Sequence, residues 1–366
     1  MCILWRQGMP FLYGAKKNII LETSQQVGVI GAGSFGTAIA QLISENANVL
    51  LFARNNDLVK KINATHEHLG IQLNKNIIAT SDPQFLAESC TLIFPVVPSV
   101  NFRAMMKSFS PYLHPYHILI HGTKGFDVRE EDMAKLEAGK ITRNEVHTMS
   151  NVIEQESSVV RIGCLSGPNL SSEIMAGQPT ATLIASPFDE VFVLGKKVLK
   201  GQRFQVFGSR SMLGAEMAGA LKNVYAIGSG VLGGLGMGKN IQAMLITRGL
   251  VEMIYFAKAF NIDKSAFLGT AGIGDLIATA TSEDSRNFTF GKRLGQGESL
   301  EEIMETMPEL AEGVRTLKIF KHLSRQHKIR VPITQMLYKA VFEGFEVEKA
   351  LKYLITYPYD VDVDFL

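Results

Sequence analysis

A single lysine interrupts an apolar, glycine-rich run of the sequence. Between Ser211 and Gly238 the only charged residues are Glu216 and Lys222, and eight residues are glycine. A buried ammonium group is costly unless it loses its proton or finds a carboxylate. Desolvation lowers a lysine pKa from about 10.4 toward neutrality, which suits a general acid and base. We interpret Lys222 as a candidate catalytic group; a structural lysine that reaches the surface is the alternative.

The spacing around Lys222 is that of a helix. On a helix over 215–231, the stripe through Lys222 carries mainly small residues, with Tyr225 as its one bulky member. The small residues are Ala215, Ala218, Gly219, Ala226, Ser229 and Gly230. A lysine on such a stripe faces something that approaches closely, either a backbone or a ligand.

A carboxylate that could pair with this lysine lies further along the chain. Asp275 stands in AGIGDLIATAT, between glycine turns and an apolar run, where a lone carboxylate needs a partner. Lys222 is the obvious candidate. Alternatively, Asp275 caps a helix and needs no further function.

Three polar residues downstream have the chemistry of an anion site. Ser285, Arg286 and Asn287 open a predicted helix and offer a hydroxyl, a guanidinium and an amide. Together with the helix N-terminus these groups can hold a phosphate. A plain capping motif is the alternative.

A glycine loop near the start of the chain points to a dinucleotide. The stretch GAGSFG, with Gly31, Gly33 and Gly36, follows an apolar strand pattern and opens a helical one. In that context the glycines permit a tight turn, close approach of the backbone to a pyrophosphate, and close packing of helix on strand. The alternative is a glycine turn without a ligand.

The residue that would read the adenosine ribose is basic. The second strand pattern ends in Arg54, and no acid follows until Asp57. NAD sites usually place Asp or Glu at this point, whereas an arginine accommodates a 2′-phosphate. The pattern favours NADP(H), with NAD(H) possible; a solvated surface arginine is the alternative.

A second lysine follows another apolar strand. Lys124 lies in HGTKGFD, and the carboxyl ends of strands in an open α/β sheet line the ligand crevice. We therefore expect Lys124 near the reacting end of a bound nicotinamide. An ordinary loop lysine is the alternative.

The elements that must position these residues alternate between strand and helix. Strands are predicted at the start of 27–43 and over 48–54, 90–97, 117–122, 161–167, 180–186 and 204–209, with helices later in 27–43 and over 83–89 and 100–109. This alternation predicts an α/β fold with a parallel, doubly wound, Rossmann-type sheet.

The character of the chain changes near residue 210. Beyond it we find helical periods broken by glycine turns, and no convincing strand. We predict a dinucleotide-binding domain over 26–209 and an all-α substrate-binding domain over 210–366. Residues 1–25 are interpreted as an N-terminal extension, and the polar stretch 129–160 as an exposed helical insertion.

Composition excludes several classes of protein. The net charge of +2 gives no global attraction to nucleic acid, and 46% hydrophobic with 20% charged residues is typical of a globular protein. Lys222 and the glycines argue against a membrane span in 211–238. Three cysteines without metal-ligand spacing indicate reduced thiols in the cytoplasm, and the eight histidines show no metal site.

Taken together, the motifs resemble those of NAD(P)-dependent glycerol-3-phosphate dehydrogenases, most closely the bacterial type. The resemblance covers residues 26 to about 345 and rests on motifs in order: GAGSFGTA, TKGF, LSGPNLSSEI, ALKNVYAIGSGVLGGLGMGKN, ITRGL, AGIGDL, SRNFTFGKRLGQG and AEGV. It implies interconversion of dihydroxyacetone phosphate and sn-glycerol 3-phosphate, which feeds phospholipid synthesis. Together with the apolar helical second domain, the resemblance suggests a homodimer; no metal is expected, since the cysteines and histidines show no metal-ligand spacing.

The resemblance assigns roles by position in these motifs. Lys222 corresponds to the proton acceptor in alcohol oxidation, and Lys124 to a residue that contacts both substrate and cofactor. Substrate-contacting positions are Gly167, Asn169, Asp275, Ser285, Arg286 and Asn287. Cofactor-contacting positions are Ser34, Phe35, Arg54, Ser171, Arg286, Leu310 and Glu312. Asn169 departs from the usual Ser or Thr, and Ser171 from the common Ala.

Two other functions compete with this one. A 3-hydroxyacid dehydrogenase of the related two-domain type also uses a lysine on a helix of the second domain, but it needs a grip for a carboxylate. The SRN cluster and AGIGDL argue against it. A non-catalytic dinucleotide-binding regulator is disfavoured because Lys124, Lys222 and Asp275 are all retained.

Overall fold

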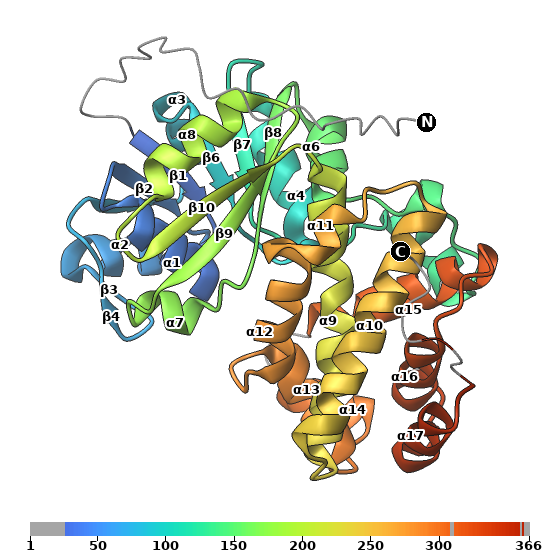
Figure 1. The fold of residues 1–366 in the computed structure, drawn as a ribbon. Helices are drawn as coiled ribbons and strands as arrows, with labels where there is room; N and C mark the ends of the chain where they lie inside the picture. Colours follow the sequence, from blue (N-terminus) through green and yellow to red (C-terminus); the bar gives the residue numbers. More distant parts are fainter. Residues whose placement is uncertain (1–25, 308–310, 359–360, 362–366) are drawn as a thin grey trace, which may run out of the picture.

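A computed structural model describes residues 26–307, 311–358 and 361. An eight-stranded sheet with helices on both faces stands beside a group of helices arranged around one long helix (Figure 1). The predicted fold class, a Rossmann-type sheet followed by helices only, is confirmed. The predicted N-terminal extension and Leu310 lie outside the described residues.

The sheet has the strand order β10-β9-β8-β7-β6-β1-β2-β5. Its strands are β1 (Gln26–Ile30), β2 (Asn48–Phe52), β5 (Ile77–Thr80), β6 (Leu92–Pro95), β7 (Ile118–His121), β8 (Arg161–Ser166), β9 (Thr180–Ala185) and β10 (Phe204–Ser209). A small separate hairpin joins β3 (Glu67–His68) and β4 (Ile71–Gln72). The chain runs outward from β1 in one direction and then restarts at β6 in the other. The β1/β6 boundary is therefore the switch point, where α/β sheets bind ligands.

Two strands correct the prediction of a fully parallel sheet. Neighbouring strands from β8 to β5 are parallel, but β9 pairs antiparallel with β8, and β10 follows β9 in that reversed direction. The connection between β8 and β9 contains only the five-residue α7, whereas parallel neighbours are usually joined by a crossover with a full helix. Strand β5 was not predicted, because it is short and its Ile78 is exposed.

Helices cover both faces of the sheet and complete two apolar cores. They are α1 (Ser34–Ile43), α2 (Asn56–Thr65), α3 (Pro83–Ser89), α4 (Ser99–Phe109), α6 (Met149–Glu156), α7 (Ser171–Met175) and α8 (Asp189–Leu199), with a short 3-10 turn at Ser110–Tyr112. Successive side chains of β1 point to opposite faces. Val29 therefore packs in one core with Ile39 of α1, and Ile30 in the other with Phe102 of α4.

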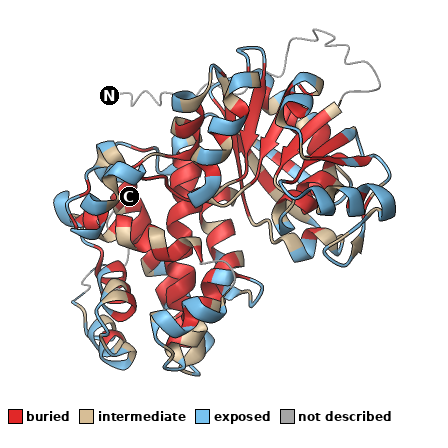
Figure 2. Ribbon diagram, turned by 180° about the vertical axis from the view of Figure 1, so that it is seen from behind, coloured by how far each residue is buried: buried red, intermediate tan, exposed pale blue. Residues whose placement is uncertain are grey.

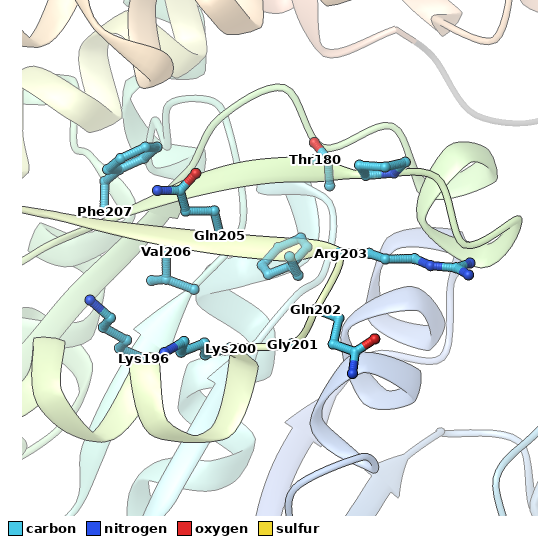
Figure 3. Close-up of a pocket in the computed structure, with 11 residues that line it drawn as sticks. Thr180, Lys196, Lys200, Gly201, Gln202, Arg203, Gln205, Val206 and Phe207 are labelled. Carbon is cyan, nitrogen blue, oxygen red and sulfur yellow. The ribbon is translucent and has the colours of Figure 1, made fainter.

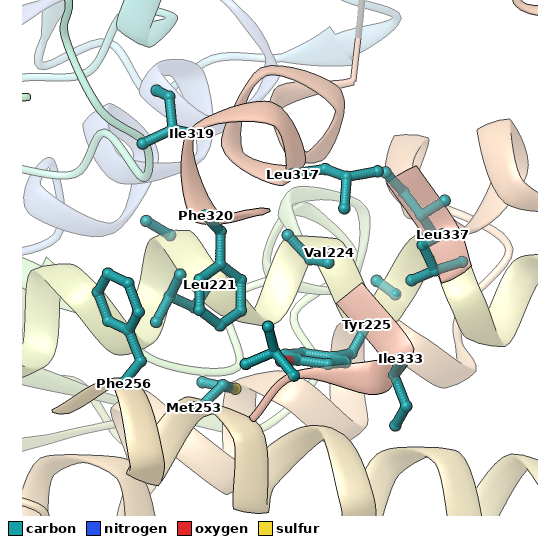
Figure 4. Packing of buried hydrophobic residues seen from close by; sticks show 14 of the residues in the cluster. Leu221, Val224, Tyr225, Met253, Phe256, Leu317, Ile319, Phe320, Ile333 and Leu337 are labelled. Carbon is teal, nitrogen blue, oxygen red and sulfur yellow. The ribbon is translucent and has the colours of Figure 1, made fainter. Parts of the chain in front are cut away.

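The helical part is built around α9 (Met212–Gly234), which is buried over most of its length (Figure 2). The other helices are α10 (Lys239–Ala259), α11 (Ser265–Leu268), α12 (Asp275–Thr281), α13 (Arg286–Gly295), α14 (Leu300–Thr306), α15 (Glu312–Gln326), α16 (Pro332–Phe342) and α17 (Val347–Ile355). Figure 4 shows Leu221 and Tyr225 of α9 packed among aromatic side chains. In that cluster Phe256 of α10 meets Phe320 of α15 edge to face, with ring centroids 4.8 Å apart.

The small-residue stripe of α9 lets another helix approach very closely. A Cβ added to Gly230 would lie 2.0 Å from the carbonyl oxygen of Phe288, and one added to Gly291 would lie 1.9 Å from that of Ile227. Helices α9 and α13 are therefore in backbone contact, which any larger side chain at these positions would prevent. At Gly230 the small-residue stripe therefore faces a backbone, which is one of the two alternatives expected from the sequence.

The stretch 129–160 is not an exposed insertion, and that prediction is wrong. It contains two 3-10 turns, Glu130–Asp132 and Arg143–Glu145, together with α5 (Met133–Glu137) and α6. Its Leu136 and Ile141 are fully buried in the same apolar cluster as α9 and α15, and α6 packs on the sheet. The apolar residues are widely spaced among charged ones, so the stretch looks polar although one side of it is core.

A buried carboxylate fastens α9 to the sheet part. Oε1 of Glu216 accepts a hydrogen bond from the Ser150 amide at 2.8 Å, and its Oε2 accepts one from the Ser150 hydroxyl at 2.6 Å. Nε2 of His121, at the end of β7, lies 3.0 Å away. Burial raises the pKa of Glu216, but the contacts with His121 and Ser150 outweigh it and hold the pKa below its usual value. Glu216 thus joins α9 to both α6 and β7.

Strand β10 ends at Ser209 and α9 begins at Met212, so the change from sheet to helices falls within a few residues. Because the 129–160 stretch packs in the helical core, the division into domains at 209/210 stays a prediction. None of the described helices is long and apolar enough to span a membrane.

Candidate active site

Lys222 lies in the middle of α9 and is almost fully buried, with 5% of its side chain exposed. Its Nζ donates a hydrogen bond to Oδ1 of Asp275 at 2.7 Å and another to the hydroxyl of Thr279. Both partners come from α12, which crosses α9 at this point. The lysine is therefore not a surface group, and the pairing expected from the sequence is present.

A local irregularity of the chain aims Asp275 at the lysine. Residues Thr270–Gly274 form a π-helical turn, and α12 starts at Asp275 itself. Such turns rotate the following side chains relative to a regular helix and are frequent at functional sites. Asp275 caps no helix end, because α12 has Gly274 at its N-cap and no side-chain cap. The capping alternative for Asp275 is wrong.

Lys124 completes a three-membered cluster. It follows β7, and its Nζ donates to Oδ2 of Asp275 at 2.6 Å and to the carbonyl oxygen of Gly167 at 3.0 Å. Asp275 therefore places one carboxylate oxygen on each lysine. Because Lys124 belongs to the sheet part and Lys222 to the helical part, the cluster lies where the two parts meet.

The electrostatics of the cluster favour proton transfer by Lys222. The pKa of Lys222 is lowered to about 8, mainly by burial. The charge of Asp275 raises this pKa, and the charge of Lys124 lowers it. A lysine with this pKa has both its neutral and its ammonium form accessible near neutral pH. It can therefore give or take a proton at a reacting oxygen, which an ordinary surface lysine does poorly.

Thr279 was not predicted from the sequence. It lies four residues after Asp275 on α12, and its hydroxyl also contacts Oδ1 of Asp275 at 3.3 Å. Side chains four apart share one face of a helix, so this spacing was a readable signal. Thr279 accepts from Lys222 and thereby fixes the direction of its ammonium group.

The SRN triplet sits at the start of α13 with mixed roles. The Ser285 hydroxyl accepts from the Phe288 amide at 3.3 Å, so the capping alternative is realised for this residue. Asn287 is buried; its Oδ1 accepts from the Gly313 amide at 2.8 Å, and its Nδ2 donates to Oδ1 of Asn223 at 3.1 Å. Arg286 alone is exposed. Asn287 therefore links α13 to the residue next to Lys222.

The SGPN turn after β8 approaches the same place. Gly167 presents its carbonyl to Lys124, whereas the Asn169 side chain is engaged by β9. Nδ2 of Asn169 donates to the Ala181 carbonyl at 3.0 Å, and its Oδ1 accepts from the Thr182 hydroxyl at 2.8 Å. Asn169 holds the shape of the turn in this structure, which the sequence did not predict.

The glycine loop after β1 has the geometry that a dinucleotide requires. Gly31 has φ +118°, and a Cβ there would lie 2.3 Å from the carbonyl oxygen of Val96, across the switch point. A Cβ on Gly36 would lie 1.9 Å from the Gly31 oxygen, whereas one on Gly33 would meet nothing within 4 Å. Gly33 and Ser34 are exposed at the start of α1, so its free amides can approach a pyrophosphate. These residues fit the group.

Three other predicted cofactor residues come from separate elements of the fold. The Phe35 ring packs close to Gly122 after β7, and Arg54 is exposed just beyond the end of β2. Glu312 accepts a hydrogen bond from the Ser99 amide at 2.7 Å, at the start of α4. Burial raises the pKa of Glu312, against the hydrogen bonds from Ser99.

Helix α7 carries Ser171, another predicted cofactor residue, and lies beside the SRN triplet. Ser171 opens α7, and the hydroxyl of the next residue, Ser172, donates to Oδ2 of Asp284 at 2.6 Å. Asp284 directly precedes Ser285, so the start of α7 lies beside the start of α13. Among the described residues, no three His, Cys, Asp or Glu side chains are grouped to hold a metal ion.

Comparisons with known proteins identify the family. Two profiles match the chain: the NAD-dependent glycerol-3-phosphate dehydrogenase N-terminus over residues 26–191 and the C-terminus over 211–352. The glycerol-3-phosphate dehydrogenase [NAD(P)+] of Saccharophagus degradans is 35% identical over 349 residues, 94% of this chain and 93% of that protein. The enzyme of the same name from Pseudomonas putida KT2440 is 38% identical, covering 94% and 98%.

A solved structure agrees with these sequences. The glycerol-3-phosphate dehydrogenase from Coxiella burnetii superposes with a TM-score of 0.81 at 29% identity, covering 92% of this chain and all of that one. The resemblance read from the sequence motifs is confirmed. The chain belongs to the NAD-dependent glycerol-3-phosphate dehydrogenase family.

Proposed function

We propose that this protein interconverts dihydroxyacetone phosphate and sn-glycerol 3-phosphate, with NADP(H) as its favoured dinucleotide. The observation that carries the proposal is the contact of one buried carboxylate, Asp275, with both Lys222 and Lys124. This cluster lies beyond the carboxyl ends of the parallel strands, where ligands of α/β proteins bind. The positive charges of the two lysines and the lowered pKa of Lys222 suit acid and base chemistry on a small polar substrate.

Lys222 is the proton donor and acceptor of the proposed reaction. The bound nicotinamide would supply a hydride to the carbonyl carbon, or accept one from the alcohol carbon. When the ketone is reduced, the ammonium form of Lys222 donates a proton to the substrate oxygen. When the alcohol is oxidised, the neutral amine accepts the hydroxyl proton. A pKa of about 8 lets one residue serve both directions near neutral pH.

Asp275 and Lys124 hold Lys222 and the substrate in place. Asp275 accepts a hydrogen bond from each ammonium group and thereby holds the Nζ of Lys222 and that of Lys124 in place. Lys124 is 18% exposed, more than Lys222, and it can contact a ligand oxygen without leaving the carboxylate. Its positive charge also stabilises negative charge that develops on the reacting oxygen.

The phosphate of the substrate is assigned to the start of α13. Arg286 is exposed in the first turn of this helix, and Ser285 and Asn287 flank it. A guanidinium with helix amides binds phosphate strongly, and this remote binding positions the reacting carbon. Gly167 and Asn169 would line the other side of the substrate through their backbone and side chain.

The dinucleotide is assigned to the switch point. Gly31, Gly33 and Gly36 would admit the pyrophosphate to α1, with Ser34 and Phe35 beside it. Arg54, exposed beyond β2 with no acid before Asp57, supports NADP(H) because a guanidinium pairs with a 2′-phosphate. Further contacts are assigned to Lys124, Ser171, Arg286, Leu310 and Glu312.

We extend the proposal to the setting of the enzyme. It would supply glycerol phosphate for phospholipid synthesis in the cytoplasm, without a metal ion. A homodimer is proposed because the helical part leaves apolar side chains exposed, among them Met244, Leu268 and Ile277. Light scattering after gel filtration would measure the mass of the particle directly.

The experiment is a parallel assay of the purified protein. We expect dihydroxyacetone phosphate to drive rapid loss of NADPH absorbance, and a smaller kcat/KM with NADH. Arg54→Asp should reverse the preference, because a carboxylate repels the 2′-phosphate and accepts from a ribose hydroxyl. If dinucleotides bind but dihydroxyacetone phosphate is not reduced, whereas a 3-hydroxyacid is oxidised, the substrate proposal is wrong. If no substrate of either class turns over, a regulatory role replaces it.

A further inference from the structure

A basic cavity opens at the free edge of the sheet, away from the candidate active site. It has a volume of about 530 Å³ and lies between β10, the start of β9 and the end of α8 (Figure 3). Its charged lining residues are Lys196, Lys200 and Arg203, and no acidic side chain lines it. In a chain with a net charge of only +2, this is a local concentration of positive charge. None of these residues belongs to the site described above.

The two lysines are available to a ligand. Lys196 and Lys200 are four residues apart at the end of α8, so their side chains leave the same face of the helix. Within the described parts of the chain, no ion pair is formed by either lysine; the Nζ of Lys196 lies 5.4 Å from the centroid of the Phe192 ring. At this end of α8 the carbonyl oxygens of Val198 and Lys200 accept hydrogen bonds from Nδ2 of Asn46 at 3.0 and 3.2 Å.

The third cation comes from another element and is held in place. Arg203 precedes β10, and its guanidinium donates to the carbonyl oxygen of Gly177 at 3.0 Å, which leaves further N–H groups of the fork for a ligand. One carboxylate lies nearby: Glu45, whose Oε2 would be 3.1 Å from a Cβ on Gly201. It pairs with none of the three cations, so the cavity keeps its positive charge.

We propose that this cavity binds a phosphorylated small molecule. The volume lies in the range of about 300–1,000 Å³ typical of small-ligand pockets, and Lys196 and Lys200, which leave the same end of α8, can bind one phosphate group, while Arg203 lies at the other end of the cavity. Figure 3 shows Lys196 and Lys200 at the end of α8 on one side of β10, Gln205 of β10 on its other side, and Thr180 on the neighbouring strand β9. Polar groups of this kind would orient the rest of the ligand.

Short hydrogen bonds connect the cavity to Lys124 of the candidate active site. Because β9 is reversed, its first residue, Thr180, lies beyond the end of β8, next to the SGPN turn. The Thr180 hydroxyl donates to the Pro168 carbonyl at 2.6 Å, and the adjacent Gly167 carbonyl accepts from Lys124. A ligand that moves Thr180 therefore acts on the backbone that positions Lys124. Occupancy of the cavity changes the KM for the phosphorylated substrate.

The test is a calorimetric titration of pyrophosphate into the full chain saturated with NADP+ and dihydroxyacetone phosphate, so that both the glycine loop and the proposed substrate-phosphate site are filled. We expect wild type and Lys197→Gln to bind alike, because Lys197 is exposed on α8 but does not line the cavity. Lys196→Gln with Lys200→Gln should weaken binding at least tenfold. Arg286→Ala, which removes the proposed substrate-phosphate contact, should leave this binding unchanged.

Unchanged pyrophosphate affinity in the lysine double variant would overturn the proposal, as would loss of binding in Arg286→Ala alone. Should the double variant melt earlier than wild type, the single variant Lys200→Gln, at an exposed position, replaces it with a smaller expected loss. The coupling is tested separately, and this part rests on the proposed function. Pyrophosphate should change the KM for dihydroxyacetone phosphate more in wild type than in the double variant, because competition at the proposed substrate-phosphate site is common to both; equal effects in both would exclude the link through Thr180.

Discussion

The ammonium group of Lys222 lies 2.7 Å from Oδ1 of Asp275, although the two residues are 53 positions apart in the chain. Both side chains are almost completely buried, so this contact is not one of the weak ion pairs of a protein surface. Breaking a buried pair by removing one partner leaves an uncompensated charge, which typically costs about 3–5 kcal/mol. Because Asp275 also holds Lys124, the pair links acid–base chemistry to substrate binding.

Lys222→Ala should abolish turnover while leaving dinucleotide binding intact. The variant lacks the group that exchanges a proton with the substrate oxygen, and no other described side chain lies in its position. General acid–base catalysis contributes on the order of 10²–10⁴ in rate, so kcat should fall by at least about a hundredfold. Steady-state assays and a titration with NADPH would measure the two quantities. Activity near that of wild type would remove Lys222 from the mechanism.

Asp275→Asn should shift the pH dependence of alcohol oxidation to lower pH. Oxidation requires neutral Lys222, so its rate should rise through a pKa of about 8 in wild type. The charge of Asp275 raises that pKa, and a neighbouring opposite charge typically contributes 1–3 pH units. Its removal should therefore move the rise downward by about one pH unit or more, as kcat/KM measured from pH 6 to 10 would reveal.

Lys124→Met provides the opposite control for this pH profile. The charge of Lys124 lowers the pKa of Lys222, so its removal should move the rise of alcohol oxidation to higher pH. A merely structural role would reduce activity in both variants without moving the profiles apart. Shifts in the same direction for Asp275→Asn and Lys124→Met would contradict the electrostatic account.

Much of the sheet could be predicted because its strands are buried on both faces and read as apolar runs. Strand direction could not, since an apolar run such as that of β9 carries no sign of which way it pairs. Leu136 and Ile141 were missed for a different reason. They are single core residues among charged ones, and only their contact with α15 makes the surrounding stretch part of the core.

The site was predictable where burial demanded a partner. A lysine and an aspartate in apolar surroundings had to meet, and Lys222 and Asp275 do. The amides were less predictable: Asn169 and Asn287 lie in motifs assigned to the substrate, yet each bonds to the protein itself. An amide serves equally as ligand contact or internal brace, and its sequence position does not distinguish the two.

Gly230→Ala should destabilise the helical part strongly. The added methyl group would lie 2.0 Å from the carbonyl oxygen of Phe288, so α13 must move away from α9. Overpacking of this kind costs about 1–3 kcal/mol. Gly238→Ala is the matched control, because a Cβ there meets nothing within 4 Å and its φ of −78° suits alanine. Urea unfolding of both variants would test the close approach; equal stabilities would contradict it.

Glu252→Gln should remove a pH dependence of stability that is built into the helical core. Glu252 of α10 accepts hydrogen bonds from Tyr225, Thr334 and the Ile333 amide at the start of α16. Burial raises the pKa of Glu252 to about 7, although these donors favour the ionised form. The folded protein therefore holds this proton more tightly than the unfolded chain does.

Because folding raises the pKa of Glu252, the stability of the folded protein falls as the pH rises. The contribution of Glu252 to stability is complete below its unfolded pKa of about 4.5 and is lost as the pH rises through about 7. At 1.36 kcal/mol for each pH unit, the loss amounts to about 3 kcal/mol. From pH 5 to 8, the stability of wild type should therefore fall relative to that of Glu252→Gln in urea unfolding. The exposed Glu67→Gln should follow wild type at every pH, and a constant difference between wild type and Glu252→Gln would show that Glu252 is ionised throughout.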